Sequence, residues 1–318
     1  MEIGLNPKIV VKFEEYRKNF DFEKYFKKLE DLNIRYLTIK DKNYPKNLKE
    51  IDGAPVVLYH LGEILPQDEN AVAIVGARKM TSYGREVATQ FATYLANYGI
   101  TIISGLALGI DAVAQKAAVD AGGRSIAVLA SGLDKITPYS NYNLAKEIVN
   151  KGGAIVSEAP LGAEIFRSSF PVRNRIVSGL SKAVIVVEGA RKSGTLLTAS
   201  HAADQGKTVF AVPGQISSPM SEAPHYLIQN GAKPAFHPKD ILDELDLQVK
   251  VDKGAVLKVL PETKEEKKII EILSNEPLHL DEVVRISKGN ISIISSTLMS
   301  MCLKGMVKDM GGGVYKKI

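Results

Sequence analysis

Residues 170–195 read FPVRNRIVSGLSKAVIVVEGARKSGT, and this stretch decides the fold. It predicts an Arg-Asn-Arg turn, a short amphipathic helix, a buried strand at 183–188, and a Lys-Ser-Gly-Thr loop that opens another helix. Two basic clusters therefore flank one strand. If that strand belongs to a parallel sheet, the loop after it carries helix N–H groups that favour an anion. A nucleic-acid phosphate is the first candidate for that anion.

The same kind of pattern extends on both sides of this stretch. Short, β-branched apolar runs occur at 71–75, 101–104, 125–130, 154–157 and 208–212. Helical spacing of apolar residues occurs between them, at 83–98, 109–120, 140–150 and 196–205. Strands that alternate with helices predict an α/β fold with a doubly wound, mostly parallel sheet. Right-handed crossovers then bring the loops after the strands to one edge of that sheet.

The two ends of the chain have patterns of their own. Residues 1–42 predict a short helical N-terminal cap, and residues 43–245 hold the alternating pattern. The segment 246–262 is predicted to be a linker, because an acidic run gives way there to apolar residues and a proline. Within 263–318, three helical patterns precede a strand, three consecutive glycines and a last strand, which is the order of elements in a winged helix.

Composition narrows the class of protein. The chain has 318 residues, 45% of them hydrophobic and 24% charged, as in ordinary globular proteins. No apolar run approaches the length of a membrane span, and one cysteine allows no internal disulfide, so we expect a cytoplasmic protein with no membrane contact. Residues 71–239 contain 17 lysines and arginines against 10 aspartates and glutamates, an excess of 7. This excess suits a polyanionic partner, although solvated surface charge is an alternative reading.

Two loops of the predicted sheet edge carry candidate ligand-binding residues. After the strand at 71–75 come Arg78 and Lys79, which would project from the edge. After the strand at 101–104, Ser104 and Gly105 begin a short loop in which the backbone can approach a phosphate closely. Asp111 would cap the following helix or hold the loop. Each loop taken alone is equally compatible with solvated cations or an ordinary capped turn.

The loop before the helix at 196–205 is a stronger candidate. Ser193 and Thr195 supply hydroxyl donors, Gly194 exposes backbone N–H groups, and Lys192 supplies charge. Simple helix capping is the alternative, and the cation beside the cap argues against it.

The second basic cluster contains Arg173 and Arg175, with Asn174 between them. The planar fork of arginine suits phosphate and can stack on bases. The same arginines could instead form a structural network with Glu158 or Glu188. Phe170 is either a stacking platform for a base or a core residue.

Motifs for catalysis are missing from the sequence. None of the five histidines lies at metal-binding spacing from another, and the acidic residues form no evident acid–base pair. Neither the dinucleotide fingerprint G-x-G-x-x-G nor the Walker A loop occurs at the strand ends. We therefore expect no catalytic residue, no metal and no cofactor.

Taken together, the motifs of this chain closely resemble those of the bacterial DNA-processing protein A family (DprA, also called Smf). The resemblance is strong over residues 43–245 and extends to the winged helix. The matching motifs, in chain order, are 44–45, 55–59, 76–78, 104–111, 122–134, 170–181, 188–199, 206–214 and 227–232.

This resemblance implies a function. Members of the family have an extended Rossmann-like domain that binds single-stranded DNA, protect incoming strands in natural transformation, help to load the recombinase RecA, and work as homodimers. The motif match transfers the DNA-binding expectation to Arg78, Arg173, Arg175, Lys192, Ser193 and Thr195. It also suggests His225, Leu227 and Ile228 at the dimer contact. With the loop residues argued above, the predicted DNA-binding set also includes Lys79, Ser104, Gly105, Asn174 and Gly194.

Two departures from the family pattern stand out. Leu108 occupies a loop position where the family usually carries arginine, and the N-terminal region is shorter than the family's usual helical domain. Two other functions remain as alternatives. One is a Rossmann-like hydrolase of nucleoside monophosphates, which would need a P-G-G-x-G-T loop that this chain lacks. The other is a winged-helix transcription regulator, which the nearly neutral third helix at 290–304 disfavours.

Overall fold

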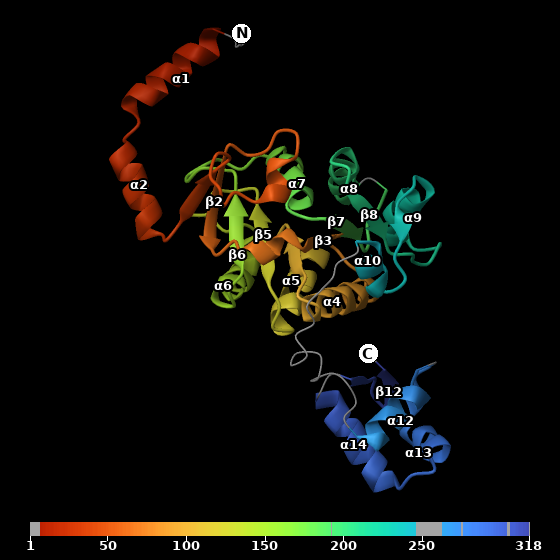
Figure 1. The fold of residues 1–318 in the computed structure, drawn as a ribbon. Helices are drawn as coiled ribbons and strands as arrows, with labels where there is room; N and C mark the ends of the chain where they lie inside the picture. The colour runs from red at the N-terminus through yellow and green to blue at the C-terminus, as the bar shows by residue number, and fades with distance from the viewer. Residues whose placement is uncertain (1–6, 192, 246–262, 275, 304–305, 318) are drawn as a thin grey trace.

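A nine-stranded sheet forms the centre of the molecule, and a smaller helical unit with its own three-stranded sheet follows near the C-terminus (Figure 1). The computed structural model describes residues 7–191, 193–245, 263–274, 276–303 and 306–317. The predicted linker at 246–262 and Lys192 lie outside these ranges.

The large sheet has the strand order β1-β2-β6-β5-β4-β3-β7-β8-β9. Neighbouring strands pair in parallel throughout the part of the sheet ordered β6-β5-β4-β3-β7-β8-β9. Strand β1 pairs with β2, and β2 with β6, in antiparallel register. The strands are β1 Arg35–Thr38, β2 Val57–Gly62, β3 Ala71–Val75, β4 Thr101–Ser104, β5 Ser125–Leu129, β6 Ala154–Ser157, β7 Ala183–Val186, β8 Thr208–Ala211 and β9 Lys233–Pro234. The predicted doubly wound, mostly parallel sheet is confirmed.

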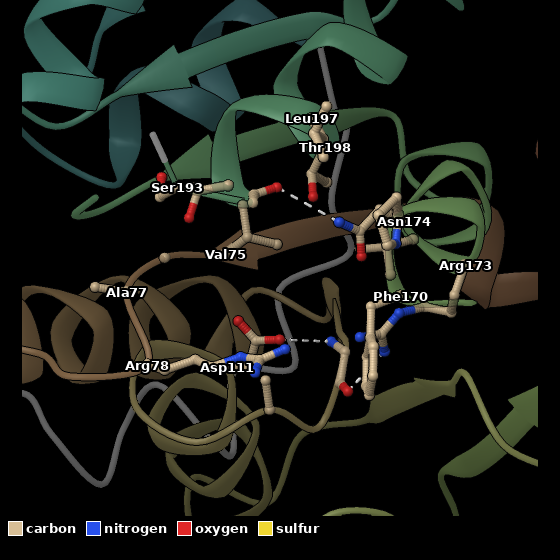
Figure 2. Close-up of a pocket in the computed structure, with 17 residues that line it drawn as sticks. Val75, Ala77, Arg78, Asp111, Phe170, Arg173, Asn174, Ser193, Leu197 and Thr198 are labelled. Carbon is tan, nitrogen blue, oxygen red and sulfur yellow. Dashed lines mark hydrogen bonds between the residues drawn. The ribbon is translucent and has the colours of Figure 1, made fainter. Parts of the chain in front are cut away.

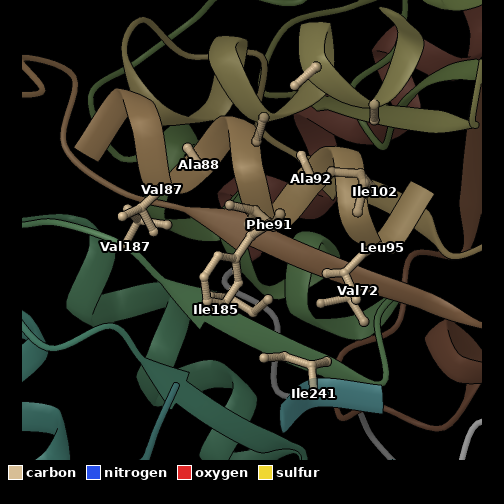
Figure 3. Packing of buried hydrophobic residues seen from close by; sticks show 14 of the residues in the cluster. Val72, Val87, Ala88, Phe91, Ala92, Leu95, Ile102, Ile185, Val187 and Ile241 are labelled. Carbon is tan, nitrogen blue, oxygen red and sulfur yellow. The ribbon is translucent and has the colours of Figure 1, made fainter. Parts of the chain in front are cut away.

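The central strands are continuous apolar runs because helices cover both faces of the sheet. Every residue of β3 is buried, and its side chains alternate between two clusters. Val72 and Ile74 pack with α4 Ser82–Asn97 and α5 Ile110–Asp120. Phe91 of α4 is one of the two buried phenylalanines in this layer and lies against the sheet beside Ile185 (Figure 3).

Helices α7 and α8 cover the opposite face. They run over Ser169–Gly179 and Thr195–Asp204, and they pack on the other side chains of β3 and β7. The remaining elements of this domain are α1 Pro7–Asn19, α2 Phe22–Asp31, α3 Lys46–Lys49, α6 Tyr142–Asn150, α9 Glu222–Gln229, α10 Lys239–Glu244 and the 3₁₀ turns η1 Pro66–Glu69, η2 Tyr139–Asn141 and η3 Pro219–Ser221.

One local prediction is wrong. The Arg-Asn-Arg sequence was expected to form a turn before a helix, but all three residues lie inside α7. The helix begins at Ser169, so Pro171 falls in its first turn, where no intrahelical N–H bond is lost. Once the helix starts there, Arg173, Ile176 and Val177 are buried together.

The C-terminal unit is a winged helix, as predicted. Its elements are α12 Lys264–Ile272, β10 Leu278–His279, α13 Leu280–Ser287, α14 Ile291–Leu303, β11 Val307–Asp309 and β12 Val314–Lys317. A separate apolar cluster that includes Ile269, Val283 and Leu298 forms its core. Across the described ranges, no helix is both long enough and apolar enough to cross a membrane.

Candidate nucleic-acid interface

A pocket opens at the point where the order of the parallel strands reverses. From β3 the chain adds β4, β5 and β6 on one side, and it then returns to place β7 on the other side of β3. In open α/β sheets, ligands bind at the carboxyl ends of the strands beside such a switch point. The pocket lies there and has a volume of about 280 Å³ (Figure 2). Its walls come from the loops after β3, β4 and β7, from α7, and from the first turns of the helices Ile110–Asp120 and Thr195–Asp204.

The loop after β3 contributes an exposed cation. Val75, Gly76 and Ala77 line the pocket, and Arg78 follows with its side chain exposed. The backbone of this loop packs closely against Gly109. A Cβ added to Gly109 would lie 2.2 Å from the Ala77 carbonyl oxygen. Gly109 also has a φ of +81°, a conformation that side-chain-bearing residues rarely adopt. Glycine at this position therefore holds the loops after β3 and β4 side by side.

The side chain of Arg173 projects from α7 beneath the pocket, and this residue is only 6% exposed. The guanidinium donates a hydrogen bond of 2.6 Å to the Gly105 carbonyl oxygen and another to the Val128 carbonyl oxygen. An added Cβ on Gly105 would lie 2.5 Å from this guanidinium, so the loop requires glycine there. Burial lowers the pKa of Arg173 to about 10, so the side chain remains charged at neutral pH.

Asp111 provides the opposite charge near Arg173. Its carboxylate accepts a hydrogen bond of 3.0 Å from the Gly105 N–H, which confirms that it holds the loop after β4. Burial raises the pKa of Asp111, while the neighbouring Arg173 and the hydrogen bond to Gly105 act in the other direction. The two charges therefore fix the loop from both sides.

The loop before α8 brings donors to the opposite wall. Ser193, Gly194 and Thr195 line the pocket, and α8 begins at Thr195. Gly194 at the N-cap has no side chain to satisfy the first N–H groups of the helix. The Ser193 hydroxyl oxygen is buried and has no hydrogen-bond partner among the described residues. Asn174 of α7 reaches this wall and donates a hydrogen bond of 3.5 Å to the Gly194 carbonyl oxygen.

Phe170 divides the pocket from a second cavity. The Arg78 guanidinium carbon lies 5.3 Å from the centre of its ring, a cation–π distance, and the two side chains face each other in Figure 2. Phe170 and Arg78 also line the second cavity, of about 160 Å³, together with Leu108, Pro138 and Ile165. Phe170 is half-buried, so it is accessible from the site and is not a core residue.

The structure brings most of the predicted DNA-binding residues together. Those that line the pocket are Arg78, Gly105, Arg173, Asn174, Ser193, Gly194 and Thr195. Lys79 is exposed but does not line it, and Lys192 lies outside the described residues. Residues of the pocket that the motifs did not single out include Ala107, Pro171, Leu197 and Thr198. Helical spacing carries the signal for Thr198, because it lies three positions after Thr195 on α8.

Three predicted contacts need correction. Ser104 is fully buried, and its hydroxyl donates a hydrogen bond of 2.7 Å to the Ile74 carbonyl oxygen, so it cannot meet a ligand. Arg173 lines the pocket, but backbone carbonyl oxygens already accept from its guanidinium. Arg175 points elsewhere, and its Nη2 donates to both carboxylate oxygens of Glu158, with both distances 2.7 Å. The alternative of a structural network is therefore correct for Arg175 and Glu158.

The residues predicted at a dimer contact lie on α9, which packs beside β8 near the edge of the sheet. The Leu227 side chain is partly buried against the core cluster of the α7–α8 face. His225 Nε2 lies 3.0 Å from the Gly214 carbonyl oxygen, and Ile228 is half-buried. Among the described strands, β9 is the last one at this end of the sheet.

Comparisons with known proteins agree on one family. The family model described as DNA recombination-mediator protein A matches residues 35–246, and the DprA winged helix domain matches residues 257–313. The chain is 45% identical to protein Smf of Escherichia coli (strain K12) over 68% of this chain and 58% of that protein. It therefore spans less than two thirds of that relative. It is 42% identical to the DNA processing protein DprA of Bacillus subtilis (strain 168) over 67% of this chain and 71% of that protein.

Solved structures agree with this assignment. DNA processing protein A of Streptococcus pneumoniae superposes with a TM-score of 0.67 at 35% identity, covering 75% of this chain and 82% of that one. DNA processing protein A of Helicobacter pylori superposes with a TM-score of 0.60 at 30% identity, covering 68% of this chain and 97% of that one. The Helicobacter structure is described as showing that protein's mode of binding single-stranded DNA.

Proposed function

This chain belongs to the DNA recombination-mediator protein A (DprA/Smf) family, and we propose that it binds single-stranded DNA through the switch-point pocket without changing it chemically. In this proposal the protein shields an incoming strand during natural transformation and assists the loading of RecA. It acts in the cytoplasm as a homodimer. The single observation that carries the proposal is the convergence of Arg78, the start of α8 and the unpartnered Ser193 hydroxyl on one pocket.

The chemistry of this pocket suits a phosphate. The first N–H groups of α8 and the positive end of its dipole favour negative charge. Arg78 supplies an exposed cation on the facing wall, and the Ser193 hydroxyl supplies a donor that has no hydrogen-bond partner within the described part of the chain. A phosphate between these walls would give the Ser193 hydroxyl the hydrogen-bond partner that it lacks among the described residues.

A single strand fits better than a duplex or a free nucleotide. Phe170 borders the phosphate pocket and offers an accessible ring on which a base could stack. Bases in a duplex are already paired and stacked, so their faces cannot reach such a ring. The loops also lack the glycine patterns by which dinucleotide and nucleoside-triphosphate sites hold their ligands.

The same pocket is poorly equipped for catalysis. Among the described residues that line it, Asp111 carries the only carboxylate, and none is a histidine, cysteine or lysine. The Asp111 carboxylate is buried and already accepts a hydrogen bond from the Gly105 N–H. This arrangement supports a binding protein over a nucleoside-monophosphate hydrolase, which needs an accessible acid or base.

Two adjacent residues allow a sharp test. Arg78 and Lys79 are both exposed, but only Arg78 lines the pocket. We expect Arg78→Ala to weaken binding of an unstructured oligonucleotide and to reduce the slope of log affinity against log salt by about 0.7, the value for one phosphate contact on a single strand. Lys79→Ala removes the same charge one position away and should change both quantities less. Equal effects of the two substitutions would show that general surface charge, and not this pocket, binds the strand.

The alternative functions give different results in related assays. A transcription regulator would prefer one duplex sequence over random duplex, and a hydrolase would release free base from nucleotides. The proposed function predicts tighter binding of single-stranded than of duplex DNA, with little dependence on sequence and a steep dependence on salt.

A further inference from the structure

We propose that the bound strand continues past Phe170, with its bases held by the apolar cavity beside Leu108 and by the exposed ring of Tyr139. This inference rests on the proposed function, because it extends the path of the same single strand. It assigns a base-stacking site to a surface outside the phosphate pocket.

The first step is the continuity of the two cavities. The phosphate pocket and the second cavity share Arg78, Gly105, Ala107, Phe170 and Arg173 as lining residues. A strand whose phosphate occupies the first cavity therefore meets the second one at the far side of the Phe170 ring. A single layer of side chains, to which Phe170 belongs, separates the two cavities.

The second step is the change in chemistry across that wall. Beyond Phe170 the lining includes Leu108, Pro138 and Ile165, which present apolar surface. The helix N-terminus and the Ser193 hydroxyl lie on the other side, in the first cavity. Apolar walls cannot neutralise a phosphate, but they can cover the face of a base that has left its stack.

The third step is the position of Tyr139. It follows Thr137 and Pro138, which line the second cavity, and begins the short turn η2. Within this turn, Asn141 donates hydrogen bonds of 2.8 Å and 3.3 Å to the carbonyl oxygens of Leu106 and Ala107. These bonds tie η2 to the loop that carries Leu108. The turn and the cavity therefore form one continuous surface.

The fourth step is the preparation of the Tyr139 ring for stacking. Tyr139 is 82% exposed, although a large aromatic side chain normally gains by burial. Its inner face stacks on Tyr142, with ring centres 5.7 Å apart and planes 19° apart. Lys146 Nζ in turn lies 4.8 Å from the centre of the Tyr142 ring. The stack restricts the Tyr139 ring before any ligand arrives, so a base can stack on its outer face at a lower entropic cost.

The test compares two probes that carry equal numbers of phosphates. One is a labelled oligothymidylate of about 20 nucleotides, and the other is a labelled backbone with the same number of abasic sites. Fluorescence anisotropy measures the affinity of the protein for each probe. We expect Tyr139→Ala to weaken binding of oligothymidylate by about 5- to 150-fold, the effect of losing one base–aromatic stack, and to leave binding of the abasic backbone unchanged. Tyr139→Phe keeps the ring and should bind both probes as the wild type does.

An exposed aromatic residue near the N-terminus, Phe13, provides a matched control. Phe13 on α1 is also an exposed aromatic, at 61%, and lines neither of the two cavities. Phe13→Ala should leave both affinities unchanged, and circular dichroism should show every variant folded.

The outcomes separate this inference from the function on which it rests. If Tyr139→Ala binds oligothymidylate like the wild type, or loses affinity equally for both probes, the stacking site is refuted. In that case a loss of binding in Arg78→Ala still supports the phosphate pocket. If the wild type binds neither probe, the proposed function fails and this inference fails with it.

Discussion

Arg173 and Arg175 stand two positions apart on α7, but their surroundings differ. Arg173 is buried beside Asp111 and donates to backbone carbonyl oxygens of the loop after β4 and of β5. Arg175 keeps 18% of its side chain exposed and pairs with Glu158, whose side chain is 37% exposed. Removing one partner of a buried pair leaves an uncompensated charge, whereas a partly exposed pair is screened by water. The two substitutions should therefore have different costs.

We expect Arg173→Met to lower the free energy of unfolding by about 3–5 kcal/mol, because the Gly105 and Val128 carbonyl oxygens lose their donor and buried Asp111 loses the neighbouring positive charge. Arg175→Gln should lower it by about 1 kcal/mol or less. Urea unfolding of both variants measures the difference. The double variant Arg173→Met/Asp111→Asn should recover part of the loss. A cost for Arg173→Met no larger than that for Arg175→Gln would contradict the positioning role given to Arg173.

Leu108 gives a second prediction for a single residue. Its side chain is 47% exposed at the second cavity, at a position where the family usually carries arginine. We expect Leu108→Arg to add a phosphate contact, so the slope of log affinity against log salt should steepen by about 0.7 for single-stranded DNA.

Val56→Arg is the control for Leu108→Arg, because Val56 is 70% exposed and lines neither cavity. It should leave the slope nearly unchanged. If both arginines steepen the slope equally, net charge and not position determines the salt dependence.

Among the secondary-structure elements, α7 is the one on which the site depends most. Its pocket side carries Phe170, Arg173 and Asn174. At its other end, Lys207 donates hydrogen bonds of 2.9 Å and 2.7 Å to the carbonyl oxygens of Gly179 and Ser181. A cation at the C-terminal end of a helix satisfies carbonyl groups that lack intrahelical partners.

Lys207 should make the stability of the protein depend on pH. Burial lowers the pKa of this side chain from 10.5 to about 8, so between these values the unfolded chain binds more protons than the folded one. Raising the pH through this window therefore favours the folded state. We expect the free energy of unfolding of the wild type, relative to Lys207→Met, to rise from pH 8 to pH 10.5. Urea unfolding across this range tests it, and a constant or falling difference would exclude the lowered pKa.

For the whole molecule, the large sheet and the winged helix have separate apolar cores. Between the described residues of the two units, an ion pair joins Lys316 to Glu86 of α4 at 2.8 Å, with side chains 42% and 58% exposed. Such a pair contributes little to stability. All of the described residues that line the phosphate pocket and the second cavity belong to the large domain, so the proposed DNA path follows that domain.

The proposed homodimer is also a property of the whole molecule. Ile228 on α9 is half-buried in the single chain and lies near the β9 end of the sheet. We expect Ile228→Asp to shift a dimer toward monomer in sedimentation velocity, because a charge in an apolar contact must be desolvated. Val56→Asp introduces the same charge elsewhere and should leave the dimer intact. Persistence of the dimer in Ile228→Asp would move the contact away from α9.

Much of the fold could be predicted because it depends on local pattern. The strands β3, β4 and β6 begin and end where their apolar runs do, and the predicted ends of β5, β7 and β8 differ by one or two residues. Hydrophobic periodicity is a property of neighbouring residues. Parallel strands that helices cover on both faces are apolar along their whole length, so their ends are easy to recognise in the sequence. The helical start of α7 was missed because its first turn contains a proline, which a helix tolerates only there.

The sequence by itself determined the doubly wound sheet, the winged helix and the edge at which the basic loops meet. Only the tertiary structure decided that Arg78 faces the pocket, that Arg173 supports it from below, and that Arg175 turns to Glu158. The physical reason is the range of the interactions. Periodicity acts between residues a few positions apart, whereas the partner of a charged side chain is set by helix phase and by groups 17 to 68 positions away in the chain.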